Sequence, residues 1–377
     1  MGRSQVREGR RAGRLPVDGG PGYSAGVSQL DVARLANVSQ AAVSRAFTPG
    51  SSIAPQTRAA VLEAARTLGY RPNALARSLV THRSNMLAII MANMWNPFYA
   101  AALSQFADQL QSLGYWVLLF RIEEDDSVDE ALLTALEYQV DGIIVTSATL
   151  SSRLAEECAN HGVPVVLFNR YTLHSNVNAV WCNSVAGGRL VADAMMDTGY
   201  DRPAFIAGDP AASTARDREA GFVERLSERG TSLHWRGQGD FTYESGAHAA
   251  REMLGTAVRP DAVFCANDLM AMATIDIARD EFGLRIPGDL AVVGFDDITP
   301  AAWPHYGLTT IRQPLERLVE VTTQLIHASI ERAGSESVLQ TLQGELVVRT
   351  SAPLVRRQKG LPSNHTYGSA QNEIDRS

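Results

Sequence analysis

The chain has 377 residues, of which 45% are hydrophobic and 20% charged, with a formal net charge of −7. This composition is typical of globular proteins, and the length is sufficient for more than one domain. It contains no run of about 18 apolar residues, and its three cysteines, Cys158, Cys182 and Cys265, lack the spacing of zinc ligands. We therefore expect no membrane helix, signal peptide, disulfide framework, metal or cofactor, which fits a reducing cytoplasm.

Charge is distributed unevenly along the chain. Residues 1–26 contain five arginines against two carboxylates, and residues 27–83 contain seven arginines against two carboxylates. The net charges are +3 and +5, so residues 84–377 carry −15. A basic head on an acidic body is typical of a protein that binds nucleic acid through one end. The polar, glycine-rich stretches 1–26 and 356–377 are predicted to be disordered tails.

Residues 29–48 predict two short helices joined by a tight turn. Ser28 can cap a first helix that begins at Gln29. The apolar residues of this helix, expected on one buried face, are Leu30, Val32, Ala33, Leu35 and Ala36. Asn37 tolerates the left-handed conformation that a sharp corner requires, and Ser39 can cap a second helix over residues 40–47.

The second helix has an outward face that could read DNA. Gln40, Ala41, Ser44 and Arg45 point away from the packing residues of this helix, at positions that reach base edges in a major groove. An ordinary helical hairpin of a protein core is the alternative. The +5 charge of this region favours DNA binding.

The sequence around and after these helices carries several motifs in a specific order. Residues 43–79 include V-S-R-A-F and T-R-A-A-V-L-E-A-A-R-T-L-G-Y-R-P-N-A-L-A-R-S-L, and further motifs lie at 96–99, 141–144, 218–222, 266–268, 293–297 and 308–313. In this order they resemble the lactose repressor, galactose repressor and purine repressor family of bacterial regulators, over residues 27–351. The resemblance implies a helix-turn-helix headpiece over residues 27–72 that binds double-stranded operator DNA.

For the headpiece, the resemblance places base reading on Gln40, Ala41 and Arg45, with Ser39 and Thr57 near phosphates. Two positions depart from the family pattern. Asn37 replaces a usual glycine, and Ala54 stands where a serine often caps the third helix, which Pro55 at the first helical position offsets in part. We expect a headpiece that folds without being especially stable.

Residues 73–83 form a predicted hinge helix and tether. Asn73 can cap a helix of about two turns, which is too short to be stable alone in water, because isolated helices need about 12–15 residues. The resemblance implies that two such hinges fold together in the minor groove and that Leu79 wedges between base pairs. A simple linker helix with Leu79 as a packing residue is the alternative.

Residues 84–355 alternate strand-like apolar runs with helical stretches. The predicted strands are 86–91, 115–120, 142–146, 164–168, 202–207, 262–266 and 291–294, and the clearest helices are 98–114 and 184–199. This alternation predicts parallel sheets with helices on both faces, and the length predicts two interleaved lobes. The expected fold is thus a small all-α headpiece plus an α/β, two-lobed body like periplasmic binding proteins.

The resemblance also implies an effector cleft between the lobes. It is lined by Phe98, Tyr99, Asn169, Arg218, Phe241, Asn267 and Asp296. Their polar groups can grip adjacent hydroxyls while the two phenylalanines stack on a sugar ring, so a carbohydrate or polyol is the first expectation. A purine-like co-repressor is the alternative, although Ala212 replaces a base-contacting arginine of the purine-binding branch. Arg170 is a further candidate that could equally form a salt bridge at the lobe boundary.

Together these features predict a homodimeric transcriptional repressor controlled by a small molecule, with induction as the default. The C-terminus has no leucine heptad, so we expect no zipper-built tetramer. A solute-binding protein of sugar transport is the competing hypothesis, but it would not need a basic helix-turn-helix. No phosphate-binding glycine motif or nucleophile arrangement indicates an enzyme.

Overall fold

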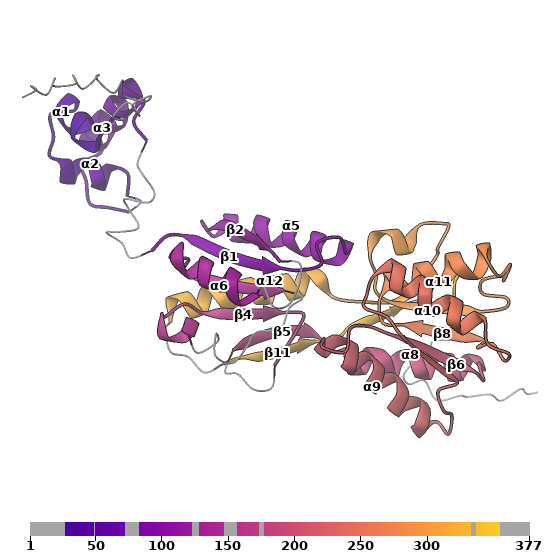
Figure 1. Ribbon diagram of the computed structural model, residues 1–377. Helices are drawn as coiled ribbons and strands as arrows, with labels where there is room; N and C mark the ends of the chain where they lie inside the picture. Colours follow the sequence, from indigo (N-terminus) through magenta and orange to yellow (C-terminus); the bar gives the residue numbers. More distant parts are fainter. Residues whose placement is uncertain are drawn as a thin grey trace, which may run out of the picture. The chain divides into compact units, whose positions relative to one another are not determined.

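The computed structural model describes residues 27–48, 50–71, 83–122, 128–146, 157–172, 177–332 and 337–354. The chain divides between His82 and Arg83 into two compact units, which are described separately (Figure 1). The predicted tails, and with them the hinge positions Asn73 and Leu79, lie outside the described residues.

The first unit contains the three predicted helices. They are α1 (Gln29–Leu35), α2 (Gln40–Ala46) and α3 (Pro55–Leu68). Val32, Val43 and Val61, one from each helix, are fully buried at the centre of a small core with several alanines. The Ser28 hydroxyl accepts a hydrogen bond from the Asp31 amide at 3.3 Å, and the Asp31 carboxylate accepts from the Ser28 amide at 2.9 Å. This reciprocal cap fixes where α1 begins.

Two details of the headpiece differ from the sequence prediction. Leu30 and Leu35 are 45% and 52% exposed and do not belong to the buried face of α1. A helix of seven residues buries only a narrow stripe, and Val32 and Ala33 occupy it. The second helix ends at Ala46 and not at Phe47, which is its C-cap. The corner residue Asn37 has φ of 53°, the left-handed conformation predicted for it.

The body contains two sheets of six strands each. The first sheet has the order β11-β5-β4-β3-β1-β2, and all its strands are parallel. Its strands are β1 (Met86–Met91), β2 (Trp116–Arg121), β3 (Gly142–Thr146), β4 (Val165–Phe168), β5 (Asn178–Cys182) and β11 (Leu339–Leu342). Helices α5 (Pro97–Ser112) and α12 (Leu315–Glu331) cover one face, and α6 (Val128–Glu137) covers the other.

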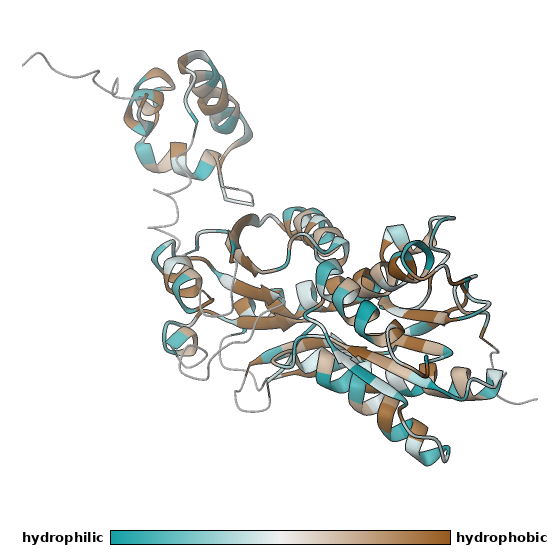
Figure 2. Ribbon diagram, turned by 45° about the vertical axis from the view of Figure 1, so that its right-hand side comes forward, coloured by the Kyte–Doolittle hydropathy of each residue, from teal (hydrophilic) through white to brown (hydrophobic). Residues whose placement is uncertain are grey.

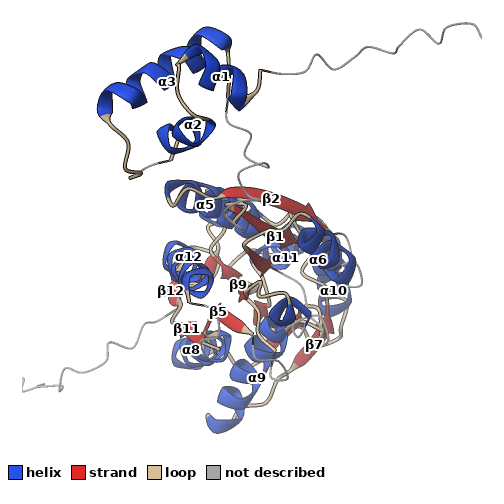
Figure 3. Ribbon diagram, turned by 90° about the vertical axis from the view of Figure 1, so that its left-hand side faces the viewer, coloured by secondary structure: helices blue, strands red, loops and turns tan. Residues whose placement is uncertain are grey.

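The second sheet has the order β12-β10-β9-β8-β6-β7, with β12 antiparallel to β10. Its strands are β6 (Pro203–Ala207), β7 (Trp235–Gln238), β8 (Ala262–Cys265), β9 (Ala291–Asp296), β10 (Thr309–Arg312) and β12 (Glu345–Val347). Helices α8 (Ser184–Thr198) and α9 (Ser213–Glu228) pair on one face, and α10 (Tyr243–Leu254) and α11 (Asp268–Asp280) pair on the other (Figure 3). The helix η2 (Thr299–Ala302) is a short 3-10 turn.

Each sheet with its helices forms one lobe, and the chain passes between the lobes three times, after β5, after β10 and between β11 and β12. The hydrophobic strands lie between helices whose outer faces are more polar (Figure 2). The two-lobed parallel architecture predicted from the sequence is therefore confirmed. The prediction missed β5, β7, β10, β11 and β12, which have only three to five residues each.

Candidate functional site

The outer face of α2 presents the predicted base-reading residues to solvent. Gln40, Ala41, Ser44 and Arg45 are all exposed, whereas the other side of the helix is buried. The Ser39 hydroxyl accepts a hydrogen bond from the Ala42 amide at 3.2 Å and so caps the helix. Its own proton remains available to a phosphate oxygen.

Thr57 lies half-buried in the first turn of α3. The α3 cap, Ala54, makes no side-chain hydrogen bond, as its residue type predicts, and Pro55 occupies the start of the helix.

The end of α2 is held by a residue that the sequence analysis did not single out. The Arg58 guanidinium, from α3, donates to the Ser51 carbonyl and hydroxyl at 3.3 and 3.1 Å. The Ser51 hydroxyl in turn donates to the carbonyl of Arg45. Arg58 thus fixes the loop after α2 and positions the backbone of Arg45.

In the body, the candidate effector residues gather where strands end. Phe98 and Tyr99 lie in the first turn of α5, Asn169 follows β4, Phe241 follows β7, Asn267 caps α11 after β8, Asp296 ends β9, and Arg218 lies on α9. All seven are buried, and all except Asn267 line one small cavity of about 20 Å³. Ligands of open parallel sheets bind at this edge, outside the carboxyl ends of the strands.

Asn267 has a different role from the other six. Its side-chain amide donates to the Phe241 carbonyl at 2.8 Å, and its side-chain oxygen accepts from the Met270 amide at 3.0 Å. Both groups are thereby engaged within the protein. Asn267 holds Phe241, whose φ of 74° is unusual for a bulky residue.

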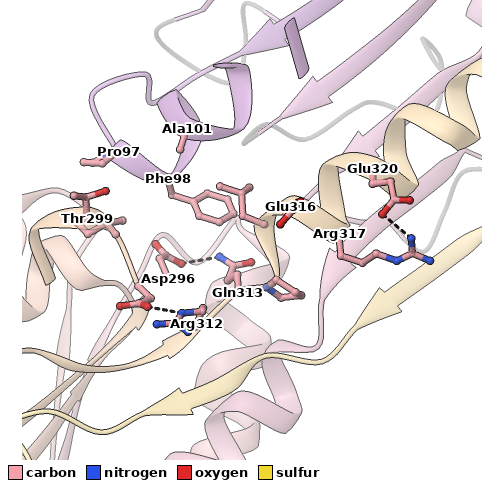
Figure 4. A pocket seen from close by; sticks show the side chains of 14 residues that line it. Pro97, Phe98, Ala101, Asp296, Thr299, Arg312, Gln313, Glu316, Arg317 and Glu320 are labelled. Atoms are coloured by element: carbon pink, nitrogen blue, oxygen red, sulfur yellow. Dashed lines mark hydrogen bonds and ion pairs between the residues drawn. The ribbon is translucent and has the colours of Figure 1, made fainter. Parts of the chain in front are cut away.

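A buried ion pair joins Arg218 to Asp296. The two side chains are 2% and 6% exposed, and Arg218 Nη2 lies 3.2 Å from Asp296 Oδ1. The Gln313 side-chain amide donates to the same oxygen at 2.7 Å (Figure 4). The Arg218 guanidinium also lies over the Phe295 ring, 3.7 Å from its centroid. Burial raises the pKa of Asp296, and the charge of Arg218 opposes that rise.

Close helix packing places Arg218. A Cβ atom at Gly188 on α8 would lie 2.4 Å from the Arg218 carbonyl, and one at Gly221 on α9 would lie 2.1 Å from the Val185 carbonyl. Because these two glycines allow α8 and α9 to touch through their backbones, α9 carries the guanidinium into the interior of the lobe.

A second buried carboxylate lies behind Asp296. Asp268 accepts the Thr310 hydroxyl at 2.6 Å and the Ile298 amide at 2.9 Å. Burial, together with the nearby charge of Asp296, raises the pKa of Asp268 well above its usual range. By binding Ile298, Asp268 holds the turn after β9, where Asp296 and Asp297 both have positive φ. Its position in the 266–268 motif was the only sign of it in the sequence.

The aromatic residues of the site pack against one another. Phe98 is 4% exposed, with its ring stacked 6.4 Å from Phe168 and edge-on to Tyr99 at 5.3 Å. The Phe98 ring therefore stacks on a protein ring in this arrangement. For Phe98 to stack on a sugar, as the sequence predicts, one face of its ring must become exposed when the lobes separate.

A larger cavity of about 600 Å³ opens beside the small one, at the start of α5 and of α12 (Figure 4). The two cavities share Phe98 and Asp296. The arginines of the larger one are paired, Arg312 with Asp297 at 2.6 Å and Arg317 with Glu320 at 2.6 Å. The sequence alone does not predict this cavity, because its lining comes from residues 97–101 and 296–320, which lie far apart in the chain.

The described residues hold no group of three histidine, cysteine or acidic side chains arranged to bind a metal ion. Within the same residues, no helix combines the length and apolar character needed to cross a membrane. The three cysteines are buried and unpaired, and burial raises the pKa of each thiol to about 12.

Comparison with known proteins decides the family. Residues 30–73 match the family of bacterial regulatory proteins, lacI family, and residues 192–352 match a periplasmic binding protein-like domain. The HTH-type transcriptional repressor PurR of Photobacterium profundum is 30% identical, over 85% of this chain and 97% of its own length. The chain belongs to the lacI family of bacterial regulators.

Two solved structures of transcriptional regulators are similar to this chain. A complex of the transcriptional regulator CelR with cellobiose is 32% identical, with a TM-score of 0.66, and covers 86% of this chain and 100% of its own. The Lac repressor dimer bound to operator and the anti-inducer ONPF is 26% identical, with a TM-score of 0.79, and covers 86% and 99%.

The chain is thus a lacI-family transcriptional repressor with an effector-binding body. The competing hypothesis of a transport solute-binding protein is wrong, because the match includes the DNA-binding region as well as the body. The relatives are repressors and not enzymes.

Proposed function

We propose that this lacI-family repressor acts in the cytoplasm as a homodimer that binds a near-palindromic operator. Each α2 reads a half-site through Gln40, Ala41 and Arg45, with Ser39, Ser44 and Thr57 nearby. Asn73 and Leu79 belong to a hinge that orders in the centre of the operator. The exposure of the outer α2 face and the buried opposite side support this orientation.

The effector is a carbohydrate or a related polyol that binds between the lobes. The observation that carries this proposal is the meeting of Phe98 and Asn169 from the first lobe with Arg218 and Asp296 from the second around one cavity. Guanidinium, amide and carboxylate groups bind adjacent hydroxyls in the geometry of a sugar. The CelR relative was solved with cellobiose, which is consistent with this ligand class.

Effector binding changes the relation of the lobes. The cavity of about 20 Å³ has room for about one water molecule, whereas small-molecule sites typically enclose about 300–1,000 Å³. A sugar therefore requires the lobes to separate. Gln313, which lies at the crossing between β10 and α12 and donates to Asp296, connects the site to that movement. An effector that favours one lobe arrangement then changes operator affinity, with release as the expected direction.

A purine-like co-repressor is the second candidate, because the relative of 30% identity is named PurR. Ala212, which has no polar side-chain group for a base, favours the polyol instead.

A thermal-shift screen tests the proposal. Sugars, polyols and nucleobases are added to the full chain, and a ligand that binds only the folded state raises its melting temperature. Ligands that bind are then tested for operator release, with Asp296→Asn as the variant that loses the response. Binding without any effect on operator affinity would contradict the proposed control.

A further inference from the structure

Arg170 is a buried cation that takes no part in the ion pair between Arg218 and Asp296. It follows β4, lines the small cavity beside Arg218, and is only 5% exposed. Within the residues that the structure describes, its Nε and Nη1 atoms have no hydrogen-bond partner. Throughout the described part of the chain, no carboxylate or aromatic ring is paired with Arg170, so the salt bridge that the sequence left open does not form.

The carboxylate of the cavity, Asp296, and the one bound to the neighbouring Tyr171, Asp217, are already engaged. Asp296 binds Arg218 and Gln313, and Asp217 accepts the Tyr171 hydroxyl at 3.0 Å. A buried charge without a partner is strongly unfavourable, so an unpartnered one calls for an explanation, such as a bound ion or ligand.

The charge balance of the cavity is positive. It is lined by two guanidinium groups, Arg170 and Arg218, and by one carboxylate, Asp296. The first turn of α9 adds to this balance, because Thr214 lines the cavity and the N-cap residue Ala212 provides no side-chain acceptor. A helix N-terminus of this kind favours a negative group.

In the neighbouring cavity of about 600 Å³, by contrast, the arginines are paired with carboxylates. Arg312 and Arg317 there are matched by Asp297 and Glu320. The unmatched charge is thus a property of the small cavity and not of the arginines in this region generally.

We propose that the effector carries an anionic group, a phosphate or a carboxylate, which Arg170 binds, on a hydroxylated carbon skeleton. Asn169, whose buried side-chain oxygen also has no partner among the described residues, accepts a hydrogen bond from a hydroxyl of the same molecule. Guanidinium binds phosphate and carboxylate with two parallel hydrogen bonds, which neutral hydroxyls cannot match in strength. This inference rests on the proposed effector cleft and narrows its ligand class to sugar phosphates and sugar acids.

Matched ligands test the inference on the full chain by thermal shift and calorimetry. Each set contains a neutral sugar, its uronic or aldonic acid and its monophosphate, for example galactose, galacturonate and galactose 6-phosphate, and inorganic phosphate is titrated separately. At constant ionic strength, at least one anionic probe should raise the melting temperature while its neutral counterpart does not. Comparing the sugar acid with the sugar phosphate shows whether the bound anionic group is a carboxylate or a phosphate.

Two variants separate Arg170 from its surroundings. Arg170→Met keeps the length and apolar stem but removes the charge, and it should weaken binding of the anionic probe by tenfold or more. The melting temperature of the free variant should be equal to or above that of the wild type, because an unpaired buried charge has been removed. Arg317→Met removes an exposed charge beside the neighbouring cavity and should leave binding unchanged.

Several results would overturn the inference. These are a neutral sugar that binds as tightly as its anionic counterparts, no response to any anionic probe, unchanged binding by Arg170→Met, or a lower melting temperature of the free Arg170→Met protein, which would reveal a structural partner. A neutral sugar that binds and releases operator would leave the proposed function standing while removing the anionic effector.

Discussion

At the scale of single residues, buried charge marks the proposed effector site of this repressor. Arg218 and Asp296 neutralise each other, and Asp268 is held by Thr310 and Ile298. Among the described residues, the Nε and Nη1 atoms of Arg170 have no hydrogen-bond partner. Globular proteins rarely bury charged side chains, and they pair those that they bury. The first three residues therefore have a structural explanation within the lobe, whereas Arg170 is explained by the anionic effector that we propose.

Asp268 should make the stability of the body dependent on pH. Its pKa in the folded chain is raised well above the usual value, mainly by burial, while in the unfolded chain it is about 3.9. Between these values the folded state holds a proton that the unfolded state has lost, so the free energy of unfolding decreases as pH rises above about 4. Asp268→Asn should remove this contribution.

Urea unfolding of wild type and Asp268→Asn from pH 4 to pH 8 checks this. The difference in free energy of unfolding, wild type minus variant, should decrease with pH at no more than about 1.4 kcal/mol per pH unit. Parallel pH profiles would show that Asp268 titrates normally.

Arg45 should determine one base position of the operator. Arg45→Ala removes a side chain that can bind guanine with two hydrogen bonds, so specificity at that position should relax by about 1–3 kcal/mol. Equilibrium binding across single-base operator variants measures this. Arg66→Ala, which removes an exposed arginine from α3, is the control. An equal loss of affinity for random DNA would reduce Arg45 to a phosphate contact.

At the scale of elements, α3 has no capping side chain at its N-cap, Ala54, although the backbone there would allow one. Ala54 has φ of −59° and ψ of 136°, close to the extended conformation of an N-cap residue. Ala54→Ser should therefore stabilise α3 by about 1 kcal/mol, measured as slower hydrogen exchange of its amides. Ala60→Ser, in the exposed middle of the same helix, should not stabilise it, and equal effects of the two substitutions would exclude capping as the cause.

The hinge is the other element whose behaviour can be tested. Leu79→Ala should reduce the bend of the operator, because alanine is too small to hold a base step open. Bending can be measured by energy transfer between dyes at the two ends of the operator. Ligand binding by the body should be unaffected, and an unaltered bend angle would remove Leu79 from the role of wedge.

The sequence predicts the elements that have strong local signals. The α1 cap at Ser28 and the corner at Asn37 were predictable because capping and positive φ depend on the residue itself. Short strands such as β11 and β12 were not, because their conformation depends on pairing with β5 and β10, which lie far away in the sequence.

The site likewise has features that the sequence indicates and features that only the three-dimensional structure shows. The sequence motifs indicated Arg218 and Asp296, but the unpaired state of Arg170 and the contact of Gln313 with Asp296 depend on three-dimensional packing. Periodicity and motif spacing contain no information about which charges meet across two lobes. The larger cavity was missed for the same reason.

At the scale of the whole molecule, we propose that a ligand in the body changes the affinity of the headpiece for DNA. Allosteric coupling typically amounts to about 1–3 kcal/mol, or about 5- to 150-fold in affinity. Coupling of binding is reciprocal, so operator DNA must change the affinity for the effector by the same factor.

The most direct test measures operator affinity as a function of effector. An operator is first selected from random duplexes with the ligand-free full chain, and fluorescence anisotropy then follows its binding while the best ligand from the screen is added. We predict a decrease in operator affinity of at least about fivefold, absent in Asp296→Asn, whose affinity without ligand remains that of the wild type. Unchanged operator affinity at saturating ligand would contradict coupling between the effector site and the headpiece.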